Sequence, residues 1–155
     1  MSGRLQWGIS TEDGCTTVAF RGPVNEDSDF DALKAEIKSG ARIRFDMSEI
    51  GRVNSCGVRE WVNFVRSLPS TCTLELDKCP PAVVSQLNMI SNFAGGARVL
   101  SVHAPFVCPQ CGGEESVLVQ VERGRLPELP ERQCRSCSSA MEFDDVEDSY
   151  FAFLR

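Results

Sequence analysis

Residues 45–61 read FDMSEIGRVNSCGVREW, and the fold prediction depends on this stretch. An apolar strand end at Phe45 leads through a predicted loop, residues 47–54, into a helix whose first turn is small and polar. One apolar stripe follows at helical spacing and Pro69 ends the helix; the stripe is Val58, Trp61, Val62, Val65 and Leu68. The stretch therefore predicts a strand, a loop and an amphipathic helix that packs through one face.

Ser55 lies at the predicted N-terminus of this helix. A serine in that position can cap the helix by accepting a hydrogen bond from a backbone N–H. The same position suits a phosphate group, because the free N–H groups and the helix dipole favour negative charge. We expect Gly57 to keep the first turn open, so that a kinase could reach the hydroxyl. The sequence is consistent with two hypotheses for Ser55, a structural cap and a phosphorylation site.

Outward from this stretch, apolar residues with period two predict short strands; these are residues 5–9, 16–20, 41–46, 72–76 and 99–102. Asp13-Gly14 is a hairpin turn signal between the first two, and Gly22-Pro23 is expected to end the second. A helix with Phe30, Leu33 and Ile37 on one face should end at Gly40. Another should open at Pro80-Pro81, with Val84, Leu87 and Phe93 on its face and Gly95-Gly96 at its end.

The predicted order of elements is therefore β-β-α-β-α-β-α-β over about the first hundred residues. Parallel strands that are joined through helices need right-handed crossovers, which place the helices against the sheet. The fold class predicted is α/β, a mixed sheet with helices packed on it.

Motif and element order together resemble the STAS family, the domain of anti-sigma factor antagonists and of sulfate-transporter tails. That family shows a strand ending in Asp, a short loop with Ser, and Asp-Ser-Ser-Gly opening a helix. Asp46 and Ser48 match the first part, and Asn54-Ser55-Cys56-Gly57 stands in the place of the second. The resemblance covers about residues 5–102 and implies a STAS-like fold.

The resemblance also implies a function. In the family, a partner kinase that is also an anti-sigma factor phosphorylates the first Ser of the motif, which switches off binding, and a phosphatase restores it. The matching residue is Ser55, and the candidate partner-binding residues are Asp46, Ser48, Asn54, Cys56 and Gly57. Asn54 replaces the usual Asp, so it keeps the capping shape but drops a negative charge, and Cys56 replaces the second Ser.

Four of the eight cysteines form two Cys-x-x-Cys pairs in the last third of the chain; they are Cys108, Cys111, Cys134 and Cys137. Such a turn places two sulfurs at two vertices of a tetrahedron around a zinc ion. Gly112 can take the left-handed conformation that closes the first pair, where the second has Ser138. We expect one structural Zn²⁺ per chain, with two disulfides or two redox pairs as the alternatives.

The other cysteines (Cys15, Cys56, Cys72 and Cys79) are scattered, and scattered thiols are usually small buried apolar groups. His103 is the only histidine, and with four cysteines available we expect it to be a strand or linker residue rather than a ligand. Four thiolates fill the zinc coordination shell, so zinc catalysis with an open position for water is not expected.

The predicted domain boundary lies near Ala104-Pro105, giving a STAS-like domain at residues 1–104 and a zinc-ribbon domain at 105–155. Residues 117–121 should form a strand of the ribbon, and residues 150–154 a terminal strand that covers the ribbon or docks on the first domain. No stretch approaches the ~20 apolar residues of a membrane helix, and the N-terminus lacks a signal-peptide core. A cytoplasmic location is therefore expected.

The last third is acidic, with ten acidic and five basic residues after position 102, within a chain of net charge −6. Nucleic-acid binding modules are normally basic, so nucleic acid is not an expected partner. The acidic run at residues 142–148 could contact a basic partner, or be a solvated face. A homodimer is plausible.

Three function classes remain. The first is a non-enzymatic regulatory interaction module of the anti-sigma factor antagonist type, with an anti-sigma factor or serine kinase as partner and the ribbon as a second surface. The second is a constitutive scaffold in which the phosphorylation site is vestigial. The third is an enzyme, a thiol redox protein that uses a Cys-x-x-Cys pair. A single histidine and the lack of a Walker-type sequence leave no other catalytic constellation, which favours the first class.

Overall fold

The computed structural model describes residues 3–37 and 42–155. The predicted helix end at Gly40 and strand start at Ala41 lie outside the described residues. The elements of the first two thirds are β1 (Gln6–Glu12), β2 (Cys15–Val24), α1 (Phe30–Glu36), β3 (Arg42–Val53), α2 (Ser55–Ser67), β4 (Thr73–Asp77), α3 (Pro81–Met89) and β5 (Arg98–Val99). The rest comprises β6 (Ser101–Val107), β7 (Glu114–Gln120), β8 (Glu142–Phe143), α4 (Glu147–Tyr150) and a 3-10 turn at Ala152–Leu154.

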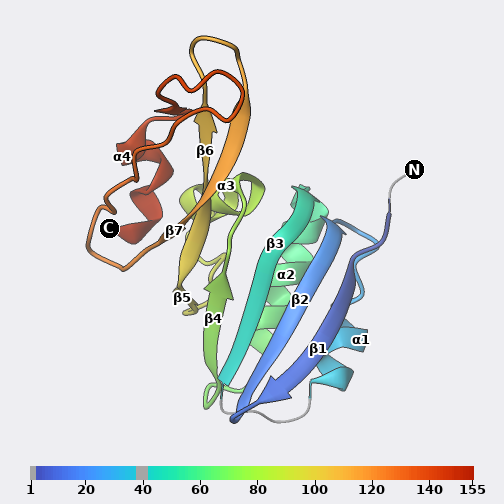
Figure 1. The fold of residues 1–155 in the computed structure, drawn as a ribbon. Helices are drawn as coiled ribbons and strands as arrows, with labels where there is room; N and C mark the ends of the chain where they lie inside the picture. The colour runs from blue at the N-terminus through green and yellow to red at the C-terminus, as the bar shows by residue number, and fades with distance from the viewer. Residues whose placement is uncertain (1–2, 38–41) are drawn as a thin grey trace.

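The first five strands form one mixed sheet in the order β1-β2-β3-β4-β5. β1 is antiparallel to β2, and the other neighbours are parallel. Helices connect the successive parallel strands, and α1 and α2 lie behind the sheet while its front face stays open (Figure 1). The predicted α/β class, element order and helix-covered mixed sheet are confirmed.

The hairpin between β1 and β2 turns at Asp13 and Gly14, which both have positive φ angles, 50° and 75°. Positive φ at both central residues defines the tight turn whose twist matches that of paired strands. The Asp-Gly signal is confirmed, although the strands extend closer to the turn than the alternating pattern indicated.

Two predicted strand ends are wrong, for one physical reason. β2 does not end at Gly22-Pro23 but runs to Val24, and β3 continues to Val53 through the predicted loop. The two strands stay paired along this length, with Gly22 opposite Ile50 and Val24 opposite Val53, and the register shifts twice. These irregularities allow Gly22 and Pro23 to lie within β2, where the sequence pattern predicted a break.

The core behind the sheet is built around Trp61 of α2, which is 2% exposed. Its ring contacts Phe20 and Phe45 edge-on, at centroid distances of 6.0 and 5.2 Å, and its Nε1–H donates to the Phe93 carbonyl at 2.9 Å. Burial of a tryptophan removes roughly 200 Å² from water, on the order of 5 kcal/mol at about 25 cal/mol per Å². This contact holds α2 against the sheet.

Phe93 does not lie on the third helix as predicted. α3 ends at Met89 and Ile90 caps it, so the predicted end at Gly95-Gly96 is wrong. Phe93 reaches the core from the following turn, where its carbonyl serves the Trp61 indole.

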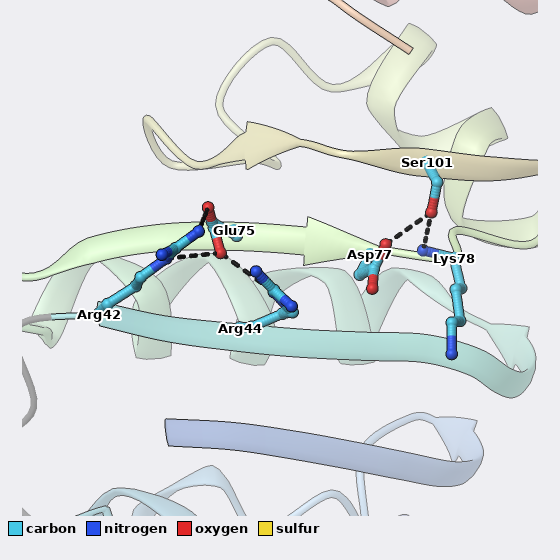
Figure 2. Close-up of polar contacts among 6 residues, drawn as sticks. All are labelled: Arg42, Arg44, Glu75, Asp77, Lys78 and Ser101. Atoms are coloured by element: carbon cyan, nitrogen blue, oxygen red, sulfur yellow. Dashed lines mark hydrogen bonds and ion pairs between the residues drawn. The ribbon is translucent and has the colours of Figure 1, made fainter. Parts of the chain in front are cut away.

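The open face of the sheet carries a compact charge cluster (Figure 2). Glu75 on β4 is 3% exposed and accepts hydrogen bonds from Arg42 Nε and Nη2, at 3.0 and 2.8 Å, and from Arg44 Nε at 3.1 Å. Arg44 and Arg98 are the register neighbours of Glu75 on the two adjacent strands. The hydrogen bond from Arg42 is the main reason that the pKa of Glu75 lies below its ordinary value, and Arg44 adds to it.

This cluster predicts a pH-dependent stability. The unfolded carboxyl titrates near 4.5, so the stabilisation by Glu75 is fully present above that pH and is lost as the pH falls through the lower folded pKa. Glu75→Gln should lower the free energy of unfolding at pH 7 by about 1–2 kcal/mol, because the half-exposed arginines are partly screened. Urea unfolding of both proteins at pH 7 and pH 3 measures this. An equal difference at the two pH values would contradict it.

β6 begins a second sheet in the order β7-β6-β8. The predicted fifth strand is divided at Leu100, which lies between β5 and β6: its N–H donates to the Leu76 carbonyl, and its carbonyl accepts from Val121. Cys79 and Val102 form a parallel bridge beside it. β6 spans the predicted boundary at Ala104-Pro105, and the buried residues of both sheets form one continuous core. The division into two domains stays a prediction.

The chain end is helical, so the predicted terminal strand at residues 150–154 is wrong. α4 and the 3-10 turn replace it, and they pack between the second sheet and α3. Tyr150 Oη donates to the His103 carbonyl at 2.6 Å, and Asn88 on α3 bonds the backbone at Tyr150 and Phe153. Apolar residues that alternate poorly over five positions can satisfy a helical turn as well as a strand.

Candidate functional site

Asn54, not Ser55, caps helix α2. The Asn54 Oδ1 accepts a hydrogen bond from the Gly57 N–H at 2.8 Å, and Asn54 has extended backbone angles. Ser55 is therefore the first helical residue, and its side chain is exposed. The reading of Ser55 as the structural cap is wrong, because the preceding residue already supplies the cap.

Glu26 also belongs to this site, although the sequence analysis did not identify it as a site residue. The Asn54 Nδ2–H donates to the Glu26 carboxylate at 2.8 Å, and this hydrogen bond lowers the pKa of Glu26. An aspartate at position 54 could not donate this bond and would place two carboxylates together. Asn54 thus complements the Glu26 carboxylate, and Glu26 supplies a negative charge close to Ser55 in place of the one that Asp would carry at position 54. The signal in the sequence was only that Glu26 lies just after a strand.

Gly57 serves packing rather than access. It is buried, and a Cβ at this position would lie 2.2 Å from the Val24 carbonyl oxygen and 2.7 Å from the Asn25 nitrogen. The same Val24 carbonyl accepts the Asn54 N–H at 3.1 Å. The expectation that Gly57 opens the first turn is replaced by a close approach between the helix and the end of β2.

Gly57→Ala should therefore be strongly destabilising, since neither backbone segment can move freely. We expect a loss of about 1–3 kcal/mol in the free energy of unfolding, a cost typical of overpacked positions. Gly51→Ala is the control, because nothing lies within 4 Å of a Cβ built there. Chemical denaturation measures both variants. A Gly57→Ala protein as stable as Gly51→Ala would contradict the close packing.

Asp46 and Ser48 lie elsewhere on the fold. They point to the face of β3 opposite the buried Phe45 and Met47, and Asp46 accepts hydrogen bonds from the Ser48 N–H and hydroxyl. Lys78 approaches Asp46 at 3.7 Å. No described contact joins these residues to Ser55. Cys56, in contrast, follows Ser55 directly in the first turn of α2 and is half-buried.

The four paired cysteines do come together. One sulfur from each of Cys108, Cys111, Cys134 and Cys137 lies within 4.8 Å of all the others. Across the two pairs, the sulfurs of Cys108 and Cys137 lie 3.4 Å apart and those of Cys111 and Cys134 lie 3.5 Å apart. A tetrahedron with metal–sulfur bonds of about 2.3 Å has edges of about 3.8 Å. The geometry is compatible with a metal site.

The two cysteine turns have the same backbone geometry. Gly112 and Ser138 donate to the carbonyls of Cys108 and Cys134 at 2.8 and 2.9 Å, and both have positive φ, 77° and 63°. The left-handed conformation predicted for Gly112 is present, and Ser138 adopts the same conformation in the second turn. Serine accepts this conformation at a cost that glycine avoids.

The surroundings favour ionisation of two of the four sulfurs, those of Cys134 and Cys137. The backbone N–H of Cys137 and that of Ser136 lower the pKa of Cys134. The Ser139 hydroxyl and N–H lower the pKa of Cys137 to about 6. At Cys111 the Gly113 N–H acts in the same direction, but hydrogen bonds with the other three cysteines outweigh it and raise the pKa to about 12. Cys111 therefore stays protonated near neutral pH in the absence of a cation, and its ionisation beside the other sulfurs requires a cation to offset their repulsion.

His103 lies on β6 and is not part of the cluster of four cysteines, as expected from its sequence context. Within the described part of the chain, its Nδ1 is buried without a hydrogen-bond partner. Cys79 is fully buried, and this burial raises the pKa of its thiol. It is therefore a small buried apolar group, as expected for a cysteine outside the Cys-x-x-Cys pairs. Among residues 3–37 and 42–155, no helix combines the length and apolar character that crossing a bilayer requires.

The fold identifies the structural class of this chain. With a mixed five-stranded sheet, helices on one face and Ser55 at the start of α2, the chain has a STAS-like fold. The solved structures include a similar one described as an anti-sigma factor antagonist from Mycobacterium paratuberculosis, with 14% identity and a TM-score of 0.53. The match covers 61% of this chain and 84% of that chain. No protein-family model and no curated protein sequence matches this chain.

Proposed function

We propose that this chain is a non-enzymatic regulatory module that binds a protein partner, in the manner of an anti-sigma factor antagonist. The observation that carries the proposal is the exposed Ser55 at the first position of α2, on a STAS-like fold. A partner with serine kinase activity would dock over the start of this helix. A cytoplasmic location and the absence of nucleic-acid binding belong to the same proposal.

The switch would act through charge. Phosphorylation of Ser55 adds about −1.5 to −2 charges at pH 7, and the Glu26 carboxylate already lies beside Asn54. The helix N–H groups and dipole tolerate the phosphate in the free protein. A docked partner would instead have to desolvate a phosphate next to a carboxylate, which disfavours the complex.

We further propose that the four cysteines hold one structural Zn²⁺. All four ligands are thiolates, and a closed four-sulfur shell is typical of structural zinc rather than of catalytic zinc. The residues from 105 onward would form a ribbon that serves as a second interaction surface. An apparent binding free energy of about 10–16 kcal/mol would be available to stabilise this small sheet.

Native mass spectrometry of protein purified without added metal tests the zinc proposal. One zinc per chain is expected, with release by a chelator and loss of metal in Cys137→Ser. Cys15→Ser, a thiol outside the cluster, should keep the metal. Metal-free protein whose mass deficit matches disulfides would overturn the zinc proposal and favour the thiol redox alternative.

Affinity capture from the source organism, with tagged Ser55→Ala and Ser55→Asp proteins as bait, tests the switch. Ser55→Ala should retain a kinase-type partner that Ser55→Asp loses by at least tenfold, because the carboxylate mimics the added charge. Ser10→Asp is the control, since Ser10 lies on β1 and pairs with Thr17, far along β2 from Val24. The purified partner with ATP should phosphorylate the wild type at Ser55.

Equal capture by the Ala and Asp variants would contradict the switch and favour the constitutive scaffold. Failure of the partner to phosphorylate Ser55 would have the same meaning. The zinc measurement is independent of both, because Ser55 begins helix α2 whereas the four cysteines lie in turns outside the strands of the second sheet.

A further inference from the structure

A hollow of about 200 Å³ lies between α3 and the segment that leads into α4. α3 contributes Pro81, Val84 and Met89 to its lining, and the segment contributes Asp145, Ser149 and Tyr150. Pockets for small-molecule ligands are usually larger, roughly 300–1,000 Å³. The size of this hollow therefore suits one side chain of a partner protein. The hollow shares no residue with the Ser55 site or with the four cysteines.

The base of the hollow is mainly apolar, and two polar groups of its lining are engaged within the chain. Val84 and Tyr150 are buried, and the Tyr150 hydroxyl donates to the His103 carbonyl at 2.6 Å. The Asn88 side-chain amide donates to the Tyr150 carbonyl at 3.0 Å and accepts from the Phe153 N–H at 2.8 Å. A side chain that enters the hollow therefore meets mainly apolar atoms.

Two exposed apolar side chains accompany the hollow. Met89, the last residue of α3, is 66% exposed, and Val146, which follows Asp145 and caps α4, is 62% exposed. They are the two most exposed of the large apolar side chains among the described residues. Apolar side chains that gather on a surface beside polar ones are typical of protein-interaction sites.

The charge beside the hollow is negative and unpaired. Asp144, Asp145 and Glu147 are exposed, and within the described residues none of them forms an ion pair. Asp148 differs, because Arg155 approaches it at 3.9 Å. On the α3 side, residues 79–97 contain no charged side chain, and no described Lys or Arg lines the hollow. Three carboxylates are therefore available to a basic ligand.

We propose that this surface, the hollow with Met89 and residues 144–148, binds a basic and apolar segment of a partner protein. One large apolar side chain of the partner enters the hollow beside Met89, and flanking Lys or Arg side chains pair with the three carboxylates. The proposal gives a location and a partner chemistry to the second interaction surface, and in that respect it rests on the proposed function. The contact is small compared with the ~1,600 Å² of a stable interface, so the complex is weak and transient.

Selection from a phage-displayed library of random peptides, with the full-length protein as target, tests this proposal. The enriched peptides should carry one large apolar residue flanked by Lys or Arg. Synthetic copies of them should bind more weakly as the salt concentration rises, because salt screens exposed charges. Enrichment of acidic peptides, or no enrichment at all, would overturn the proposal.

Matched substitutions test where a selected peptide binds. Glu147→Lys reverses an unpaired charge and Met89→Ser removes an exposed apolar side chain, so each should weaken binding by about threefold to tenfold. Glu12→Lys on β1 and Leu126→Ser in the loop after β7 are the controls, because both side chains are exposed and neither lines the hollow. A peptide that binds all four variants equally would contradict the assignment of this surface.

Two further measurements separate this proposal from the Ser55 switch and from self-association. Ser55→Asp should bind the selected peptide like the wild type, whether or not Ser55 acts as a switch, because Ser55 does not line the hollow. Loss of peptide binding in Ser55→Asp would place the peptide at the Ser55 site and overturn the proposal. Self-association of the wild type in sedimentation velocity that Glu147→Lys and Met89→Ser both abolish would also overturn it, because the surface would then bind a second copy.

Discussion

The structure depends on the close contact between the end of β2 and the start of α2. The Val24 carbonyl accepts the Asn54 N–H, and the Gly57 Cα lies against the same peptide group. This contact sets where α2 begins, and Trp61 then reaches the phenylalanines of β2 and β3. The cap, the exposure of Ser55 and the packing of the main core are consequences of one backbone approach that only glycine permits.

A second constraint joins the two sheets. Leu100 bonds to β4 through its N–H and to the chain after β7 through its carbonyl, so a single residue belongs to the edges of both sheets. The chain end then closes over the second sheet through Tyr150 and the α3 residue Asn88. Both sheets therefore contribute to one core, to which Cys108 and Cys134 of the cysteine turns also belong.

Much of the fold followed from local sequence signals. The Asp13-Gly14 hairpin, the opening of α3 at Pro81 and the amphipathic α2 were predicted because their causes act within a few residues. The late parts of β2 and β3 were missed, because their pairing depends on a parallel neighbour that is distant in sequence. The gathering of the four cysteines was expected from spacing, since each Cys-x-x-Cys turn arranges its own pair of sulfurs.

The sequence by itself determined the α/β class, the order of elements and which four cysteines come together, because periodicity, turn chemistry and cysteine spacing are local properties. The tertiary structure decided that Asn54 rather than Ser55 caps α2, that Glu26 lies beside it, and that Glu75 is buried between two arginines. Those outcomes depend on which residues meet across strands and loops, and no local pattern encodes such meetings.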